Sequence, residues 1–532
     1  MKKLIIATFL LGCLGISARA ADSQTASPTF RNPVLWADVP DPDVIRVGND
    51  FYLVSTTMHL MPGGPVMTSK DLVNWHTVSY LFDRLIDSPK YDMRGGTVYG
   101  LGQWATSLKY HNGMFYALFA PNDSPGGESY LYQTKDPRQG WTLRTRLPHF
   151  HDCSLFFDDD DRVYVFHGTG HLQELKADLS GVKEDGLNLR LFERDSTETG
   201  LLEGSRVIKK DGKYYLLMVS WPQNKPRRQV CYRANRLEGP WEKRVILEST
   251  FGGFSYVGQG TIVDDAKGNW YGVIFQDRAA VGRVLTLMPC HWEDGWPMLG
   301  DPDGKVPTDM PVPCQGEKQH NGIVTSDEFN ASTLSLNWQW NHNPIDEAWS
   351  LTDRKGWLRL HTSRPANHIF DAPNTISQRM MGPTCTGIVK MDLGGMREGD
   401  RAGLSAFNGD AVQLMASRQN GHTLLFVEEA SVKFSKSKKI EQVSQRTTGQ
   451  KELHGDIVYL RIDADFNPGK DIASLSYSTD GTTWHKLGED FKMKYDFTRL
   501  FMGSRFAIFN YTTEKPGGHV DIDWFHFSCG EK

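Results

Sequence analysis

The sequence lacks three features that mark large classes of protein. Its 59 Lys and Arg residues form no basic run and are outnumbered by 64 Asp and Glu, so we expect no nucleic acid or other polyanion as partner. After the N-terminus, no apolar run approaches the roughly 20 residues that cross a bilayer, and we expect no membrane span. Amphipathic helical patterns of useful length are also missing, which leaves β-strands.

Cysteine is scarce as well. The 7 cysteines of the 532 residues are scattered singly, with no pair at metal-ligand spacing. His167 and His171 in HGTGH have metal-like spacing, but we interpret them as loop residues beside a strand. We therefore predict no metal site. A disulfide is compatible with an oxidising compartment, for example from Cys314, but the sequence assigns no pairing.

The first 20 residues have the pattern of a secretory signal peptide. Lys2 and Lys3 precede an apolar run, and Ala18-Arg19-Ala20 forms a small-x-small cleavage site. The sequence thus predicts export, with the periplasm as the expected location and residues 1–20 removed. Leu-Leu-Gly-Cys at 10–13 also resembles a lipoprotein box, but the apolar run ahead of Cys13 is short for lipidation.

A five-fold internal repeat dominates residues 28–315. In each copy an acidic, amide or tryptophan side chain is followed 11 or 12 positions later, beyond a turn, by a tyrosine in an apolar strand. The tyrosines are 48 to 64 residues apart, which fits a four-stranded propeller blade. We predict an all-β fold with a five-bladed β-propeller; a β-sandwich with coincidental turns would not explain five matched spacings. The pairs are Asp41 and Tyr52, Trp104 and Tyr116, Asp152 and Tyr164, Glu203 and Tyr215, and Gln259 and Tyr271.

A second domain follows a linker. Residues 301–322 are rich in Pro, Gly and polar residues and lack apolar periodicity. Beyond them, long strands alternate apolar and polar residues, as at 389–393, 458–464 and 519–527. This half-buried antiparallel pattern predicts a β-sandwich of jelly-roll type over residues 323–530.

The repeat places five side chains around one axis. Equivalent positions on successive blades converge, so Asp41, Asp152 and Glu203 are expected to meet there with Trp104 and Gln259. Acids with a purely structural role usually lie on turns and face solvent. Three converging carboxylates suit glycoside hydrolysis: one donates a proton to the leaving oxygen, a second activates water, and a third orients the acid.

Several segments resemble glycoside hydrolase family 43, the five-bladed-propeller arabinofuranosidases and xylosidases. NPVLWADVPDPDVIRVGNDFYLVSTT resembles the opening of that family, and DEFNASTLSLNWQW to DIDWFHF resembles its C-terminal concanavalin-like domain. FHDCSLFFDDDDRVYVF, LLEGSRVIKKDGKYYLL and CHWEDGWPML resemble later signatures. The resemblance implies Asp41 as general base, Glu203 as general acid, and Asp152 as the residue that orients the acid and modulates its pKa.

The candidate substrate-binding residues are Trp104 and Gln259, which the repeat places at the axis, and Arg283 and His59, which the resemblance supplies. Arg283 in VGRV matches an arginine that contacts the terminal sugar in family xylosidases; the alternative is a surface arginine in a hairpin. His59 lies in a stretch that lines the pocket in relatives, with a structural role as the alternative. Gln259 stands where many members have a histidine that helps to hold a cation, so a structural cation is disfavoured and no cofactor is expected.

The predicted function is an inverting, exo-acting hydrolase that releases terminal α-L-arabinofuranosyl groups from plant hemicellulose or its oligosaccharides. A β-D-xylosidase, or an enzyme with both activities, is the main alternative. A non-catalytic sugar-binding propeller is a remote one, because such proteins usually lose a carboxylate. A retaining fructan-type hydrolase would carry signatures that are missing here. The resemblance suggests that the C-terminal sandwich closes the pocket; binding polysaccharide on its own is the alternative.

Overall fold

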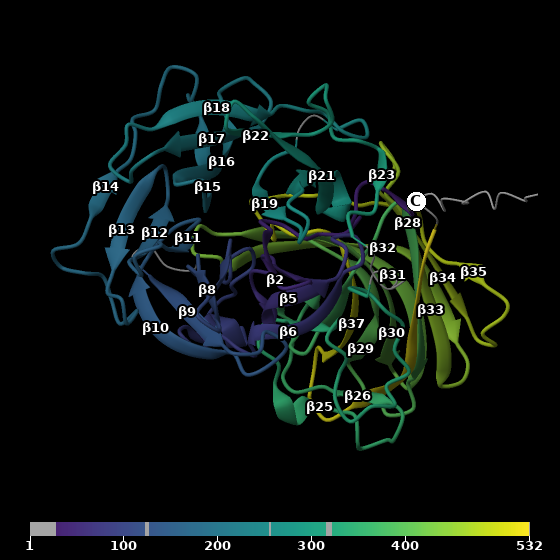
Figure 1. Cartoon of the computed structure of the whole chain (residues 1–532). Coiled ribbons are helices and arrows are strands. Elements are labelled where there is room, and N and C mark those ends of the chain that lie inside the picture. Colours follow the sequence, from purple (N-terminus) through teal and green to yellow (C-terminus); the bar gives the residue numbers. More distant parts are fainter. Residues whose placement is uncertain (1–27, 123–126, 255–256, 315–321, 531–532) are drawn as a thin grey trace, which may run out of the picture.

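Two bodies of β-sheet lie side by side in the computed structural model of this chain (Figure 1), which describes residues 28–122, 127–254, 257–314 and 322–530. Five four-stranded sheets form a ring, drawn in purple to teal, and two larger sheets form a sandwich, drawn in green to yellow. The predicted all-β fold, a five-bladed propeller followed by a sandwich, is confirmed. The predicted signal peptide and Cys13 lie outside the described residues.

The five blades follow the order of the repeat, and each predicted tyrosine lies on the second strand of its blade. Blade 1 contains β2 (Asp43–Val47), β3 (Asp50–Val54), β5 (Gly63–Ser69) and β6 (His76–Phe82); blade 2, β7 (Ser107–His111), β8 (Met114–Phe119), β9 (Glu128–Thr134) and β10 (Thr142–Pro148); blade 3, β11 (Ser154–Phe157), β12 (Val163–His167), β13 (His171–Leu175) and β14 (Asn188–Arg190); blade 4, β15 (Leu201–Lys210), β16 (Lys213–Trp221), β17 (Arg228–Ala234) and β18 (Glu242–Leu247); blade 5, β19 (Gly260–Asp264), β20 (Trp270–Asp277), β21 (Arg283–Glu293) and β22 (Trp296–Leu299).

Apolar side chains pack between neighbouring blades and hold the ring together. Tyr215 of blade 4, for example, shares a buried cluster with Ile262 and Ile274 of blade 5. At the ends of the propeller segment, β1 (Thr29–Arg31) pairs antiparallel with β23 (Asp309–Pro311). The inner strands β2, β7, β11, β15 and β19 therefore surround one axis, and the residues at their N-terminal ends share one end of it.

The sandwich consists of two antiparallel sheets around a continuous apolar core. Alternate residues of β28 and β33 are buried, which confirms the alternating pattern read from the sequence. One sheet runs β32 (Ile440–Leu453), β31 (His422–Phe434), β30 (Asp410–Gln419), β29 (Asp400–Phe407), β37 (Arg505–Thr512), β27 (Ile376–Arg379), β24 (Gln339–Asn341) and β4 (Leu60–Met61); the other runs β25 (Trp349–Ser350), β26 (Leu358–His361), β38 (His519–Cys529), β28 (Thr384–Asp392), β33 (Ile457–Asp465), β34 (Ile472–Ser478) and β35 (His485–Lys486), with β36 (Phe491–Lys492) also on β34.

The two bodies share a sheet, which the predicted ranges 28–315 and 323–530 do not anticipate. Strand β4 belongs by sequence to blade 1, yet it pairs with β24 of the sandwich, with Met61 opposite Trp340. In the described part of the chain, short 3-10 helices occupy four connections: η1 (Pro89–Asp92), η2 (Ala279–Val281), η3 (Asp346–Ala348) and η4 (Ile369–Asp371). The sandwich is therefore built against the propeller rather than tethered to it.

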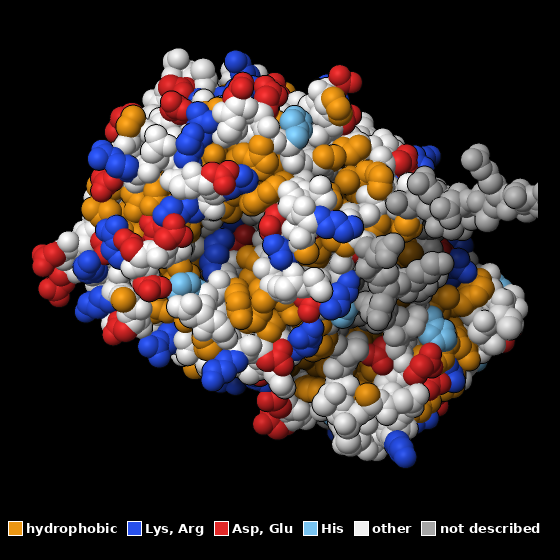
Figure 2. Space-filling model, in the orientation of Figure 1, with side chains coloured by type: hydrophobic (Ala, Val, Ile, Leu, Met, Phe, Trp, Pro, Cys, Tyr) orange, Lys and Arg blue, Asp and Glu red, His pale blue; other side chains and the backbone are white. Residues whose placement is uncertain are grey.

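The charge distribution on the surface and the lengths of the helices relate to the predictions of no polyanionic partner and no membrane span. On the face shown in Figure 2, acidic and basic side chains are interspersed. Within the described part of the chain, no helix is both long and apolar enough to cross a membrane.

Candidate active site

Three acidic side chains gather at one end of the propeller axis. Asp41 and Asp152 lie two residues before the inner strands β2 and β11 and are buried, whereas Glu203 is the third residue of β15, at a register shift, and keeps part of its surface exposed. Asp41 and Asp152 have left-handed backbones, with φ of 54° and 47°. Such conformations cost on the order of 1–3 kcal/mol and concentrate at functional sites. The turns thus hold two carboxylates where an unstrained strand would not.

Asp152, Glu203 and His151 form the tightest group of the site. One ligand-type atom from each lies within 4.8 Å of the others, and His151 Nε2 is 3.2 Å from Glu203 Oε2. Burial, followed by the charge of Glu203, raises the pKa of Asp152 to about 7. The hydrogen bond with Glu203 is the main cause that raises the pKa of His151 to about 9. The group therefore carries protons near neutral pH.

Asp41 has a different environment. Thr56 Oγ1 donates a hydrogen bond to Asp41 Oδ2 at 2.6 Å, and Arg283 Nη1 lies 3.6 Å from the same oxygen. The hydroxyl and the guanidinium thus hold this carboxylate in a fixed orientation. Asp152, by contrast, has another carboxylate as its strongest charged neighbour. Asp41 and Asp152 thus lie in different electrostatic environments, which is the arrangement that acid–base pairs in hydrolases use.

Gln259 approaches Asp152 from blade 5, and Gly204 makes room for it. Gln259 Nε2 lies 3.5 Å from Asp152 Oδ2. Gly204 has φ of +76°, and a Cβ on it would lie 2.7 Å from Gln259 Cδ. Glycine is therefore required next to Glu203 for both its backbone conformation and this close approach. The Glu-Gly pair read from the sequence has a physical reason.

Arg206 fills the axis beneath the carboxylates. Its side chain is fully buried and lies 3.6 Å from the buried carboxylate of Asp43. Its guanidinium donates to backbone carbonyls of four blades: Asp41 at 3.0 Å, Thr106 at 3.2 Å, Cys153 at 3.3 Å and Ser205 at 2.8 Å. One side chain thus ties the turns that carry two of the acids. Sequence reasoning missed Arg206, because nothing local distinguishes an inward arginine from an outward one.

The sandwich contributes one wall of the site. Phe501, in the connection between β36 and β37, stacks on the Arg283 guanidinium at 4.3 Å, and its ring is 5.6 Å from that of Trp104. Arg283 Nη2 donates to the Phe501 carbonyl at 3.0 Å. Asp38 fixes both partners, since it accepts from the backbone N–H of Arg283 at 2.7 Å and of Gly503 at 3.0 Å.

Three of the four predicted substrate-binding residues lie at the axial site, and the fourth does not. Trp104 and Gln259 lie beside the acids as expected, and Arg283 is buried next to Asp41, which excludes the surface-hairpin alternative. His59 is different, because it is 0% exposed and packs against Tyr99 and His342 at ring distances of 4.8 and 5.2 Å. With no exposed surface, His59 packs the junction between propeller and sandwich, and the predicted sugar contact is corrected to this structural role.

Sequence reasoning also missed His151 and Phe501. His151 directly precedes Asp152 in the FHDC stretch, so its position next to a predicted site acid was the signal that could have identified it. Phe501 carries no motif and belongs to the other domain. Its role depends on a contact between segments that only the folded chain brings together.

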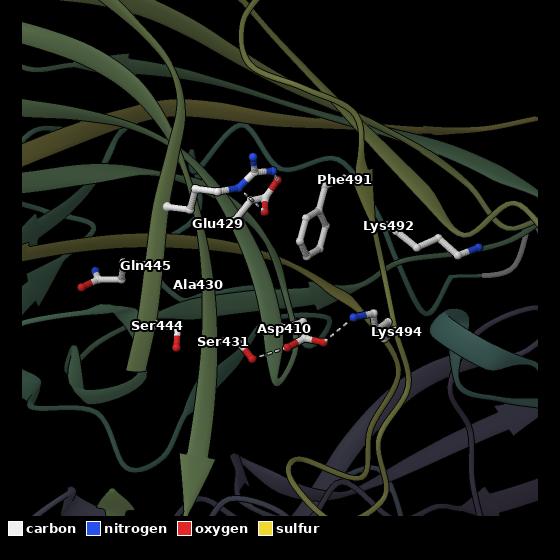
Figure 3. Close-up of a pocket in the computed structure, with 10 residues that line it drawn as sticks. Asp410, Glu429, Ala430, Ser431, Ser444, Gln445, Phe491, Lys492 and Lys494 are labelled. Atoms are coloured by element: carbon white, nitrogen blue, oxygen red, sulfur yellow. Dashed lines mark hydrogen bonds and ion pairs between the residues drawn. The ribbon is translucent and has the colours of Figure 1, made fainter. Parts of the chain in front are cut away.

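A separate hollow lies on the sandwich, between β30, β31, β32 and the segment around Phe491 (Figure 3). Its acids have partners of their own: Asp410 contacts Ser431 and Lys494, and Glu429 is paired with Arg446. Because these charges compensate one another, the hollow has no free acid–base pair. The axial group is therefore the candidate active site.

Comparison with known proteins agrees with this geometry. The family model described as glycosyl hydrolases family 43 matches residues 30–297, which is half of the chain, and the model described as beta xylosidase C-terminal concanavalin A-like domain matches residues 326–528. The chain belongs to glycosyl hydrolase family 43. It is a glycosidase of that family, with a polysaccharide or its fragments as substrate, and its sandwich is of the concanavalin-like type.

Relatives within the family carry two activity names. A beta-xylosidase of Formosa agariphila is 28% identical and covers 96% of this chain and 93% of its own. A non-reducing end alpha-L-arabinofuranosidase of Bacteroides ovatus is 26% identical and covers 96% of each. Among solved structures, a bifunctional GH43-CE protein of Bacteroides eggerthii is 38% identical with a TM-score of 0.86, covering 95% of this chain; this chain spans 64% of that protein.

Proposed function

We propose that this glycosidase is exo-acting and inverting and that it releases terminal α-L-arabinofuranosyl groups from plant hemicellulose or its oligosaccharides. The observation that carries the proposal is the axial group itself. Asp41 stands beside a guanidinium and a hydroxyl, while Glu203 is hydrogen-bonded to His151 and lies beside the buried Asp152. Release of β-D-xylosyl groups is the second candidate, favoured by the name of the Formosa relative.

The roles of the three acids follow from their surroundings. Asp41 acts as general base: it takes a proton from the water that attacks the anomeric carbon. Glu203 acts as general acid and gives its proton to the leaving oxygen, so that the sugar inverts its configuration. Asp152 keeps Glu203 in position and is the proposed modulator of its pKa, since one oxygen of each lies within 4.8 Å of the other.

His151 returns protons to the acid. Its imidazole holds a proton up to a pKa of about 9 and is hydrogen-bonded to Glu203. After Glu203 has protonated the leaving group, the partly exposed imidazole can relay a proton from solvent to it, taking one up on its exposed edge as it hands one over. Returning a proton to Glu203 therefore requires no movement of the blades.

The closed end of the site supports exo action. Phe501 contacts both Arg283 and Trp104 beside Asp41, so the chain of a polymer has no free path past the base on that side. The hydroxyls of a terminal sugar placed there would contact the arginine, and the faces of the sugar ring would contact the aromatic side chains. The sandwich thus takes part in closing the pocket.

Hydrolysis of two nitrophenyl glycosides, α-L-arabinofuranoside and β-D-xylopyranoside, tests the sugar. A strong preference for the first supports the arabinofuranosidase, a preference for the second replaces it by the xylosidase, and comparable rates mean a bifunctional enzyme. Activity on neither would turn the proposal toward a binding propeller. Proton NMR of the first released sugar tests the stereochemistry, since a retained anomer contradicts Asp41 as a base.

We further propose that the reaction needs no metal and that the protein is exported by its leader. His151, Asp152 and Glu203 lie close enough to hold a cation, but a protonated imidazole is a poor ligand, and the Arg206 charge opposes a second cation. Dialysis against a chelator should leave the rate unchanged. Export predicts that the mature protein begins at Ala21; a lipid on Cys13 would show as added mass on a longer chain.

A further inference from the structure

Two cysteines face each other across neighbouring strands of the sandwich. In the register of β28 and β38, Cys385 is the direct partner of Cys529. Residues directly opposite in antiparallel strands point their side chains to the same face of the sheet. Among the described residues, no other two cysteines are strand partners. This pairing is independent of the active site.

The hydrogen-bond pattern places the two side chains at bonding range. The Gly530 N–H donates to the Thr384 carbonyl at 2.9 Å. This bond joins the residues just outside the pair, so Cys385 and Cys529 form a non-hydrogen-bonded pair. Such pairs have Cα atoms about 4.5 Å apart, and disulfides span Cα separations of roughly 4.4–6.8 Å.

We propose that Cys385 and Cys529 form a structural disulfide that locks the last strand of the chain to the centre of the sandwich. The other described cysteines offer no comparable partner in the strand register, since Cys153 and Cys314 lie outside strands and Cys231 and Cys290 lie on different blades. Both are free thiols in the structure, and the Cα spacing typical of such a pair lies within the range that a disulfide spans. The register thus assigns the pairing that the sequence left open.

The surroundings of the two sulfurs give the order of the reaction. Cys529 is exposed, whereas Cys385 is 3% exposed, and burial raises the pKa of its thiol to about 12. The Cys529 thiolate attacks the disulfide of an external thiol oxidant, forms a mixed disulfide and releases one thiol. Cys385 then loses its proton, attacks the Cys529 sulfur and releases the second thiol. Two cysteines are oxidised and one external disulfide is reduced to two thiols.

The bond would enclose the sandwich from β28 to its last strand. β28 opens and β38 ends the loop that it closes, and this loop includes the segment that carries Phe501. Cross-linking residues far apart in the chain stabilises mainly by restricting the unfolded state, more so for long loops. The domain that forms one wall of the site would therefore resist unfolding in an oxidising compartment.

The test treats the purified full-length chain with oxidised glutathione or with dithiothreitol. Non-reducing peptide mapping of the oxidised protein should recover the Cys385 and Cys529 peptides linked, two hydrogens lighter than their sum. The melting temperature should exceed that of the reduced protein by roughly 5–10 °C. Cys529→Ser should melt like the reduced wild type in both buffers, while Cys314→Ser should keep the difference.

Three outcomes would overturn the proposal. Mapping that leaves Cys385 as a free thiol, or that joins Cys529 to Cys314 or to a second chain, excludes the bond. Equal melting temperatures for oxidised and reduced wild type, with the linked peptide present, exclude the stabilising role. Because Cys529 is exposed, its serine variant is expected to fold, and its hydrolysis rate should match that of the wild type.

Discussion

Acidic side chains gather in two places in this molecule, and the two groups differ in how their charge is compensated. In the sandwich hollow (Figure 3), burial alone would raise the pKa of Asp410, but hydrogen bonds from Arg499 and Ser431 lower it to about 2. At the propeller axis, burial and the neighbouring Glu203 raise the pKa of Asp152 to about 7. The same side-chain type is thus shifted in opposite directions.

The difference distinguishes structural acids from reactive ones. Asp410 has Arg499, Ser431 and Lys494 beside it and no second acid among the main causes of its pKa shift, so its ionised form stabilises the fold. A carboxylate buried beside another one destabilises the fold when it ionises, and proteins keep such arrangements where chemistry requires them. By this criterion only the axial group of the two is prepared for acid–base work.

The largest effect is expected from Glu203→Gln. Removing the general acid should reduce kcat/KM on natural linkages by about 10²–10⁴-fold, because the leaving oxygen must then depart unprotonated. Aryl glycosides with a good leaving group should lose far less. The measurement is the ratio of the two losses. Asp410→Asn, in the sandwich hollow, serves as control and should leave both rates unchanged; equal losses on both substrates for Glu203→Gln would remove the acid role.

Arg206→Met should destabilise the propeller by about 3–5 kcal/mol, because it removes one of the two cations beside the buried Asp43, the other being Lys109, together with the hydrogen bonds to carbonyls of four blades. Urea unfolding followed by tryptophan fluorescence measures the loss. Arg461→Met is the matched control in the sandwich: Arg461 pairs with Asp463 at a partly exposed site, and its loss should cost less than about 1 kcal/mol. Similar losses for the two variants would show that Arg206 does not hold the blades together.

The pH dependence of stability should have opposite signs in Asp152→Asn and Asp410→Asn. The pKa of Asp152 is raised in the folded protein, so wild-type stability falls as pH rises from about 4 to 7. Asparagine removes this fall and should stabilise the protein by roughly 2 kcal/mol at pH 8 but not at pH 4.

Asp410 has a lowered pKa, so its contribution is present above about pH 4 and is lost as pH falls toward 2. Asp410→Asn should therefore destabilise by roughly 2 kcal/mol at pH 8, with the difference shrinking in acid. Denaturant titrations of both variants at several pH values check the pair. Two curves of the same sign would mean that the axial and sandwich acids do not differ as described.

Local pattern predicted the propeller and the places of Asp41, Asp152 and Glu203, because a repeat fixes which residues share a position. It did not reveal contacts that depend on two distant segments. Strand β4 pairs with β24 although about 280 residues separate them, and Phe501 reaches Arg283 from the other domain. His59 was misassigned for the same reason: its stretch borders the sandwich, and sequence does not tell which side of a loop is covered.

Phe501→Ala should have a smaller, specific effect on the part of the site that the sandwich supplies. Losing the ring that covers Arg283 and faces Trp104 should raise KM for a terminal pentoside by about tenfold, on the order of 1.4 kcal/mol, with a smaller change in kcat. Phe497→Ala is the control, since Phe497 is 68% exposed and near the same segment. If Phe497→Ala raised KM as much as Phe501→Ala, general loosening of the segment would explain the loss. A KM effect confined to Phe501 would make the sandwich part of the substrate-binding site, joined to the axial acids by Arg283.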